Sequence, residues 1–330
     1  MSASEPTPRI SVALCTRNGA TYIEQQLLSI LDQSIEPTQL VVSDDASTDD
    51  TIARVRDIAA RYPAVALTVF ENEPALGVTK NFEQAIRACT GDLIALSDQD
   101  DVWHPARLEQ FVKRFATHPE VALIHSDARL VDAAGAWLGH TLAEALDVGA
   151  SEVQSIHAGD GFSVLLRRNV VTGACTVFRS SLVEYAAPFP AGWVHDEWLG
   201  VIAAAVASTD FIDEATIDYR QHGANQIGAT KLDITGKFHR MIEPRRDRNA
   251  RLEANTTVLV DRLQRLGARV SDEKLRRALA KLDHERMRNA LPEPRIRRVP
   301  AVMGAFFAGN YHRYSRGPLD AVRDVLQPVD

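Results

Sequence analysis

The sequence has few cysteines and no long apolar run, and these absences argue against a cysteine-ligated metal site and a membrane-spanning helix. Its three cysteines, Cys15, Cys89 and Cys175, lie far apart among 330 residues and form no C-x-x-C pair. This spacing argues against a cysteine-ligated zinc site and favours a reduced, cytoplasmic chain. No stretch approaches the roughly 18 consecutive apolar residues of a membrane-spanning helix. The first residues also lack the basic and then apolar pattern of a signal peptide.

The first 230 residues contain few basic side chains, and the last 100 contain few acidic ones. Residues 1–230 hold 15 lysines and arginines against 31 acidic residues, whereas residues 231–330 hold 22 against 13. The acidic part argues against nucleic acid as a ligand, because such binding depends on neutralising phosphates. The basic part is most simply a solvated helical surface. Alternatively, it holds the protein at anionic lipid or binds a partner, which includes a second copy of the chain.

Short β-branched runs alternate with helical stretches from residue 9 to about residue 131. We expect strands at 10–15, 40–43, 66–70, 93–96 and 121–124, separated by helices at 22–31, 52–62, 81–88 and 106–115. This alternation is typical of βαβ units around a mostly parallel sheet. Residues 139–161 have weak periodicity, which predicts a loop. We therefore expect an α/β domain over residues 1–230 and a helical extension over residues 231–330.

Polar side chains follow three of the expected strands. Residues 16–19 follow the first strand, Asp44 and Asp45 the second, and residues 98–101 the fourth. Ligands of open α/β sheets bind at the carboxyl ends of the strands, so we expect one shared site there. Asp44 and Asp45 are either helix-capping acids or acceptors of hydrogen bonds from a base or ribose. Thr16 and Asn18 supply matching polar groups in the second case.

Three carboxylates within four residues, those of Asp98, Asp100 and Asp101, are the strongest signal in the sequence. Such a cluster after an apolar strand is costly unless a positive group lies among the acids. Mg²⁺ and Mn²⁺ prefer hard oxygen ligands, often carboxylates combined with substrate phosphates. The dipole of a helix N-terminus would account for only one or two of these acids. We therefore expect Mn²⁺ or Mg²⁺ at this site.

Seven motifs occur in a fixed order along the chain. They are T-R-N-G-x-x-Y-I (16–23), S-D-D-A-S-T-D (43–49), G-V-x-K-N-F (77–82), S-D-Q-D-D-V-W (97–103), T-G-A-C (172–175), H-D-E-W (195–198) and Y-R-Q-H-G (219–223). In this order they resemble the family 2 inverting glycosyltransferases of GT-A fold. Within that family the chain looks most like bacterial rhamnosyltransferases of surface-polysaccharide biosynthesis. The resemblance covers roughly residues 9–228.

The resemblance implies a nucleotide-diphospho-sugar transferase fold, with a Rossmann-like, mixed and mostly parallel sheet. It implies transfer of a sugar from a dTDP- or UDP-sugar to a hydroxyl of a polysaccharide or lipid-linked saccharide. The expected location is cytoplasmic, at the inner face of the cell membrane if the basic extension contacts lipid. The helical extension is expected to contact the acceptor or the membrane, or to join copies of the chain in an oligomer. Two alternatives stay open: a nucleotidyltransferase that makes sugar nucleotides, and a non-catalytic relative that only binds them.

The resemblance also implies a role for each matching residue. Asp196 corresponds to the general base, and Asp100 and His222 to metal ligands. The subgroup commonly has two aromatic residues after His-Asp, whereas here Glu197 precedes Trp198, so Glu197 is a competing base. Trp103, Glu197 and Trp198 are expected at the acceptor, although the two tryptophans suit a core equally well. The residues expected to bind the nucleotide sugar are Thr16, Asn18, Asp44, Asp45, Lys80, Asn81, Asp98 and Asp101.

Overall fold

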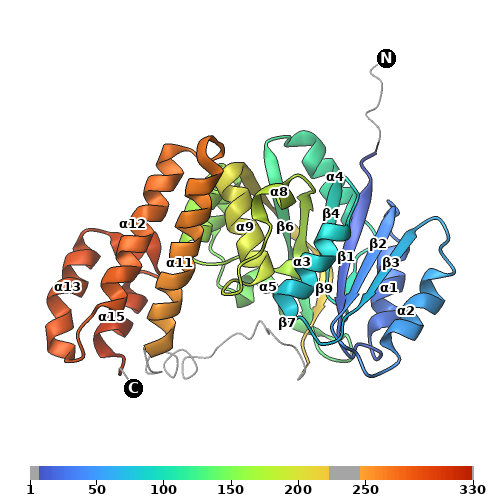
Figure 1. Ribbon diagram of the computed structural model, residues 1–330, viewed down its shortest axis with the longest axis horizontal. Helices are drawn as coiled ribbons and strands as arrows, with labels where there is room; N and C mark the ends of the chain where they lie inside the picture. The colour runs from blue at the N-terminus through green and yellow to red at the C-terminus, as the bar shows by residue number, and fades with distance from the viewer. Residues whose placement is uncertain (1–6, 223–245, 329–330) are drawn as a thin grey trace, which may run out of the picture.

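The computed structural model describes residues 7–222 and 246–328. Its strands form one nine-stranded sheet, and the first four βα units follow the expected order (Figure 1). The strands are β1 (Ile10–Thr16), β2 (Gln39–Asp44), β3 (Ala66–Glu71), β4 (Leu93–Ser97), β5 (Val102–Trp103), β6 (Val121–Val131), β7 (Trp137–Thr141), β8 (Thr176–Arg179) and β9 (Ser208–Arg220).

Helices connect these strands and continue beyond them. Those of the α/β part are α1 (Ile23–Leu31), α2 (Thr51–Ala59), α3 (Val78–Ala88), α4 (Arg107–Thr117), α5 (Leu142–Ala145), α6 (Ala150–His157), α7 (Gly161–Arg167), α8 (Leu182–Ala186) and α9 (His195–Val206). Those of the C-terminal extension are α11 (Arg246–Leu266), α12 (Asp272–Asn289), α13 (Arg295–Phe307), α14 (Asn310–Tyr314) and α15 (Pro318–Leu326).

The strand order places the carboxyl ends of β1, β2 and β4 at one edge of the sheet. The order is β3-β2-β1-β4-β8-β6-β9-β5, with β7 paired to β6. Strands β1 to β4 pair in parallel, and β8 then runs antiparallel between β4 and β6. The chain progresses outward from β1 in both directions, so β1 and β4 border the switch point at which α/β sheets bind ligands. The expected mixed sheet is confirmed.

Alternating residues of the buried strands enter two separate cores. Val12 and Leu14 of β1 pack with α1, α2 and α4, whereas Ala13 and Cys15 pack with α3, α7 and α9. This division follows from the two-residue repeat of a strand, which points successive side chains to opposite faces. Both faces of the sheet are therefore covered by helices, and the apolar runs of the sequence reflect that burial.

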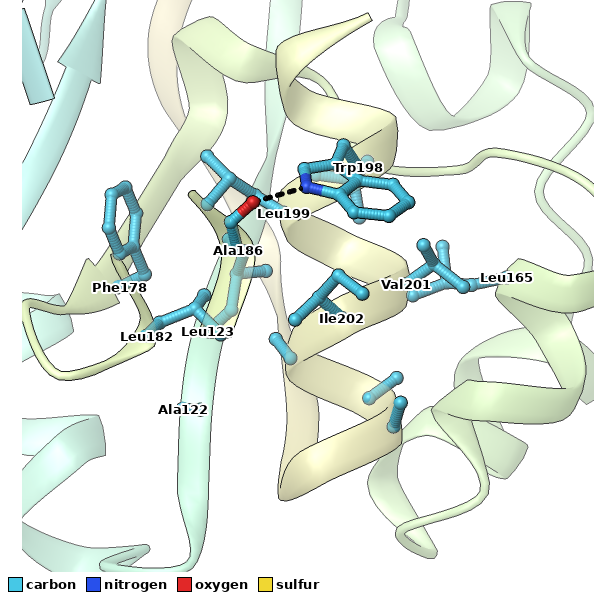
Figure 2. Close-up of a cluster of buried hydrophobic side chains, with 14 of the residues drawn as sticks. Ala122, Leu123, Leu165, Phe178, Leu182, Ala186, Trp198, Leu199, Val201 and Ile202 are labelled. Carbon is cyan, nitrogen blue, oxygen red and sulfur yellow. Dashed lines mark hydrogen bonds between the residues drawn. The ribbon is translucent and has the colours of Figure 1, made fainter. Parts of the chain in front are cut away.

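Trp198 lies in the core on one face of the sheet and not at a ligand site. Its side chain is 0% exposed, and its indole Nε1 donates to the carbonyl of Ala186 over 2.7 Å (Figure 2). The guanidinium of Arg262, on α11, lies 5.0 Å from its ring centroid. The expected contact of Trp198 with an acceptor is wrong, because a sugar would have to displace these neighbours.

The C-terminal extension shares a core with the α/β part. Leu259 and Leu263 of α11 belong to the same apolar cluster as Trp198 and Leu199 of α9. A separate small cluster, built around Val302 and Tyr311, holds α13, α14 and α15 together. The expected helical character is confirmed in residues 246–328, whereas the expected boundary near residue 230 lies outside the described residues. In the described parts of the chain, no helix has the length and apolar composition needed to cross a membrane.

Residues 139–161 differ from the expected loop. They hold the end of β7, α5, α6 and the first residue of α7. Helix α5 begins with a capping box, in which Thr141 Oγ1 accepts from the amide of Glu144 and Glu144 accepts from the amide of Thr141. Such local hydrogen bonds stabilise short helices without a long apolar period, which is why periodicity did not reveal them.

Candidate active site

A cavity of about 810 Å³ opens where β1, β2 and β4 end. The N-terminus of α9 and the end of β9 complete its wall, so segments far apart in the sequence meet there. Of the residues proposed for a site from the sequence, those that line the cavity are Thr16, Asn18, Asp45, Asn81, Asp98, Asp100, Asp196, Glu197 and His222. The strand ends therefore converge on one site, as their polar residues predicted.

The turn after β1 is locked to the two neighbouring loops. Asn18 adopts a positive φ of 48°, and its Oδ1 accepts from the amide of Thr48 over 2.8 Å. The side chain of Gln99 pairs with the backbone of Arg17, accepting from its amide over 2.7 Å and donating to its carbonyl over 3.0 Å. A Cβ atom at Gly19 would lie 2.3 Å from Gln99 Oε1. Glycine at position 19 is thus required for this close approach.

Asp44 and Asp45 are neighbours in sequence but have different environments. Asp44 Oδ1 accepts from Thr16 Oγ1 and from Ser47 Oγ, each over 2.6 Å, and Asp44 does not line the cavity. Asp45 lines it, and its Oδ2 accepts from the amide of Gly77 over 3.1 Å. Asp44 therefore stabilises the loops, whereas Asp45 presents a carboxylate fixed by the N-terminus of α3.

Asp98 and Asp100 line the cavity after β4. Burial, followed by the charges of Asp100 and Asp196, raises the pKa of Asp98 to about 7. Asp100 Oδ2 lies 2.7 Å from His222 Nε2, and both side chains are 13% exposed. The ring of His222 also stacks on Tyr22, with 5.0 Å between centroids. The structure thus pairs the two residues that the sequence analysis assigned to a metal.

Asp101 does not line the cavity, although the resemblance implied a contact with the donor. Its side chain is 1% exposed, and Oδ1 accepts from the amide of Arg220 over 3.0 Å. Burial, with the charges of Asp100 and Asp98, raises its pKa well above the ordinary value. Asp101 is thus a buried acid that is hydrogen-bonded to β9 and lies outside the cavity lining.

Two more residues that the resemblance assigned to ligand contacts lie outside the cavity lining. Lys80 does not line the cavity, because its Nζ donates to Glu83 Oε2 over 2.6 Å and to the carbonyl of Phe189 over 2.8 Å. Trp103 is 2% exposed and lies under the guanidinium of Arg107, so it belongs to the core and not to an acceptor platform. Asn81 lines the cavity, but its amide already donates to the carbonyl of Ser43 over 2.8 Å.

The first turn of α9 brings two carboxylates to the opening. Asp196 Oδ2 accepts from the amide of Gly173 over 2.9 Å, and its Oδ1 accepts from the amide of Glu197 over 2.6 Å. Burial, and then the charge of Asp196, raises the pKa of Glu197 to about 7. His195 lies beneath them, stacked on Phe82 with 3.8 Å between ring centroids. The two candidate bases therefore differ, since backbone amides fix both oxygens of Asp196 and burial disfavours ionisation of Glu197.

Three further groups, which were not predicted from the sequence, shape the site. Arg17 is the one lysine or arginine that lines the cavity among the residues described, and its Nη1 lies 3.9 Å from Asp45 Oδ2. Gln99 fixes the β1 turn, and Gly173 fixes Asp196. All three occur inside the quoted motifs. Their roles depend on which loop each one meets, and that information is absent from local sequence.

The side chains that line the cavity suit a divalent cation whose coordination shell is completed by a bound ligand. Five carboxylates line the cavity against one arginine, namely those of Asp45, Asp98, Asp100, Asp196 and Glu197. Within residues 7–222 and 246–328, no three His, Cys, Asp or Glu side chains are close enough to hold a metal by themselves. Asp100 and His222 would therefore supply two ligands, with phosphate oxygens and waters supplying the others, which is common for Mg²⁺.

The profile of glycosyl transferase family 2 matches residues 11–184, more than half of the chain. The chain belongs to glycosyl transferase family 2. The dTDP-rhamnosyl transferase RfbG of Shigella flexneri is 25% identical to this family 2 chain over 237 residues, 69% of this chain and 78% of that protein. The uncharacterized protein Rv1520 of Mycobacterium tuberculosis is 32% identical over 129 residues. That match covers 38% of this chain and 37% of the mycobacterial protein, well under two thirds of its length.

Solved structures share the fold of this family 2 chain. S. aureus TarS 1-349 in complex with UDP-GlcNAc has a TM-score of 0.59 at 16% identity, covering 96% of this chain and 90% of that one. The mannosyltransferase PcManGT from Pyrobaculum calidifontis, in complex with GDP-Man and Mn²⁺, has a TM-score of 0.51 at 21% identity, covering 92% and 77%. At these identities the likeness concerns the fold alone.

Proposed function

We propose that this family 2 chain is an inverting, metal-assisted glycosyltransferase that moves a rhamnose-like sugar from a dTDP- or UDP-sugar to a hydroxyl of a saccharide acceptor. One observation carries the proposal: the Asp100–His222 pair, Asp45 and Asp196 all line a single cavity. The name of the Shigella relative supports the rhamnosyl donor, and the GDP-Man and Mn²⁺ bound to PcManGT support a nucleotide sugar with a divalent cation. A polysaccharide or lipid-linked saccharide is the acceptor class that the resemblance implies.

The nucleotide would bind where β1 and β2 end. Asp45 is held by the backbone at the start of α3, so its carboxylate is fixed to accept from a base N–H or a ribose hydroxyl. Arg17 and the turn after β1 lie beside it and would contact the diphosphate. Asp100 and His222 would hold the cation, which when bound neutralises charge on the departing diphosphate.

In this proposal Asp196 takes the proton of the acceptor. The acceptor oxygen forms a bond to the anomeric carbon as the bond from that carbon to the diphosphate oxygen breaks, and the hydroxyl proton passes to the carboxylate. A single base on the acceptor side is sufficient for such a displacement, and it inverts the anomeric configuration. Because backbone amides orient Asp196, no rearrangement of its side chain is needed before attack.

Donor turnover tests the proposal. Release of nucleoside diphosphate from dTDP-rhamnose and UDP-sugars is measured with Mn²⁺, with Mg²⁺ and with chelator, each with and without a saccharide acceptor. We expect release that depends on metal and acceptor, and NMR of the product should give an anomer opposite to that of the donor. Retained configuration would disprove inversion. Donor binding without turnover of any pair would favour a non-catalytic sugar-nucleotide-binding protein.

A further inference from the structure

Half of the exposed large apolar side chains in the described residues lie at one end of the molecule. Six of the twelve exposed large apolar side chains in the described residues belong to α13 and α15: Ile296, Met303, Phe307, Leu319, Val322 and Leu326. These two helices pack together at the end of the molecule farthest from α2 (Figure 1). Scattered apolar residues are ordinary on a surface, but a concentration of this kind marks an interaction site.

The exposed residues follow helical spacing. On α13, Ile296, Pro300, Met303 and Phe307 are exposed at intervals of four, three and four residues, and Ile296 and Phe307 are 78% and 79% exposed. Residues at this spacing lie along one side of a helix. The apolar surface is therefore a continuous stripe with bulky groups at both ends.

Helix α15 repeats this arrangement next to α13. Leu319, Val322 and Leu326 are exposed at intervals of three and four residues, while Ala321 and Asp324 of the same helix are buried. On α13 the buried residues are Arg298 and Val302. Both helices thus have a separate inner face that anchors them, and their outer apolar residues are not needed for the core of this small bundle.

The exposed charge of the segment that carries the stripes is nearly all positive. The exposed charged residues between 290 and 328 are Glu293 and four arginines, namely Arg295, Arg297, Arg313 and Arg316. The other acids of this segment, Asp320 and Asp324, are buried, and Asp324 accepts from Arg288. Arg295 and Arg297 flank Ile296 on α13, and this pairing of basic and apolar groups complements an anionic lipid bilayer, since aliphatic groups enter the acyl boundary while arginines remain at the headgroups.

A second copy of the chain suits this surface less well. A two-fold dimer through this patch would bring Arg295 and Arg297 of both copies into one interface. Glu293 is the one exposed acid of residues 290–328 that could compensate them. We propose that the α13–α15 patch, defined as the six exposed apolar residues together with Arg295 and Arg297, binds the surface of an anionic membrane.

Vesicle sedimentation tests this proposal without donor or acceptor, so its outcome is independent of the proposed transferase activity. The full chain is mixed with phosphatidylcholine vesicles and with vesicles that contain about 30% phosphatidylglycerol. We expect partition into the anionic vesicles. The double variant Ile296→Ser/Phe307→Ser should reduce the partition coefficient at least about tenfold, because each substitution removes apolar area from the contact with the bilayer. The matched control, Val258→Ser/Leu279→Ser, alters exposed residues of α11 and α12 and should bind as the wild type does.

The arginines are tested in the same assay. Arg295→Gln/Arg297→Gln should weaken binding to anionic vesicles about fivefold per arginine, and Arg265→Gln/Arg276→Gln, on the other helices, should not. Circular dichroism and melting temperature establish that each variant is folded. Absence of vesicle binding, or equal binding by the patch and control variants, overturns the proposal. Dissociation of a dimer by the Ile296→Ser/Phe307→Ser variant in sedimentation velocity overturns it as well, since the patch would then join two chains.

Discussion

The backbone amide of Gly173 donates a hydrogen bond to Asp196 Oδ2 over 2.9 Å. The same glycine lies against the imidazole of His195, because a Cβ atom at position 173 would be 2.7 Å from His195 Nε2 and 3.7 Å from Asp196 Cβ. The backbone of Gly173 therefore fixes the carboxylate of Asp196, and the ring of His195 leaves no room for a side chain at position 173. Gly173 is a positioning residue for the proposed base.

Gly173→Ala should reduce kcat about a hundredfold, because displacement of a reacting group by about 1 Å has that effect. The added methyl group must push His195 or the 173–175 turn away, and Asp196 moves with either of them. Steady-state kinetics with donor and acceptor measure the loss. KM for the donor should change little, since the contacts proposed for the nucleotide follow β1 and β2 and lie apart from Gly173.

Gly304→Ala provides the control for this substitution. A Cβ atom at Gly304 would meet no heavy atom within 4 Å, so the same chemical change should leave kcat unaltered. Normal activity in Gly173→Ala would indicate that Asp196 does not need the amide of residue 173 for its role.

Asp100→Ala should weaken Mn²⁺-dependent donor binding at least about tenfold, because a charged ligand of the cation is lost. His222→Gln should have a similar but smaller effect, since the neighbouring carboxylate at 2.7 Å remains. Calorimetric titration of donor with Mn²⁺ and with chelator measures both. Asp57→Ala, an exposed acid on α2, should bind donor normally. Unchanged metal-dependent affinity in Asp100→Ala would remove the metal assignment.

The ends of the strands were predictable from the sequence, but the direction of individual side chains was not. The apolar period located β1, β2 and β4, and their carboxyl ends in a parallel sheet had to converge. Asp44 and Asp45 carry the same chemistry in adjacent positions. One binds Thr16 and Ser47, and the other faces the cavity. The register of β2 places Asp44 opposite Thr16 of β1, whereas the start of α3 holds Asp45.

The tryptophans illustrate a second limit of local sequence. Trp103 and Trp198 follow acidic motifs, a pattern as suitable for a sugar platform as for a core. Burial of Trp198 depends on Ala186 and on Arg262, which are 12 and 64 residues away in the chain. The apolar stripe on α13 was missed for a related reason, because helical spacing alone does not indicate which face of a helix is covered.

Asp196→Asn should lower kcat by a factor of about 10² to 10⁴ and leave donor affinity intact, as expected for loss of a general base. Glu197→Gln should retain most of the activity, because Glu197 is not the base in this assignment. Product formation and calorimetric donor binding are measured for both variants. The reverse pattern, an inactive Glu197→Gln and an active Asp196→Asn, would transfer the role of base to Glu197.

Glu197 should also make the stability of the protein depend on pH. Burial and the charge of Asp196 raise its pKa to about 7, whereas a glutamate in an unfolded chain has a pKa of about 4.3. A raised pKa in the folded state contributes stability at low pH that is lost as the pH rises through 7, because the folded chain holds a proton that the unfolded chain releases. Glu197→Gln removes this dependence, so its free energy of unfolding relative to wild type should grow by about 2 kcal/mol from about pH 5 to about pH 8.5. Urea titrations at both pH values measure the difference, with the exposed Glu184→Gln as control. A difference that is the same at both pH values would mean that the carboxyl of Glu197 titrates as an ordinary glutamate.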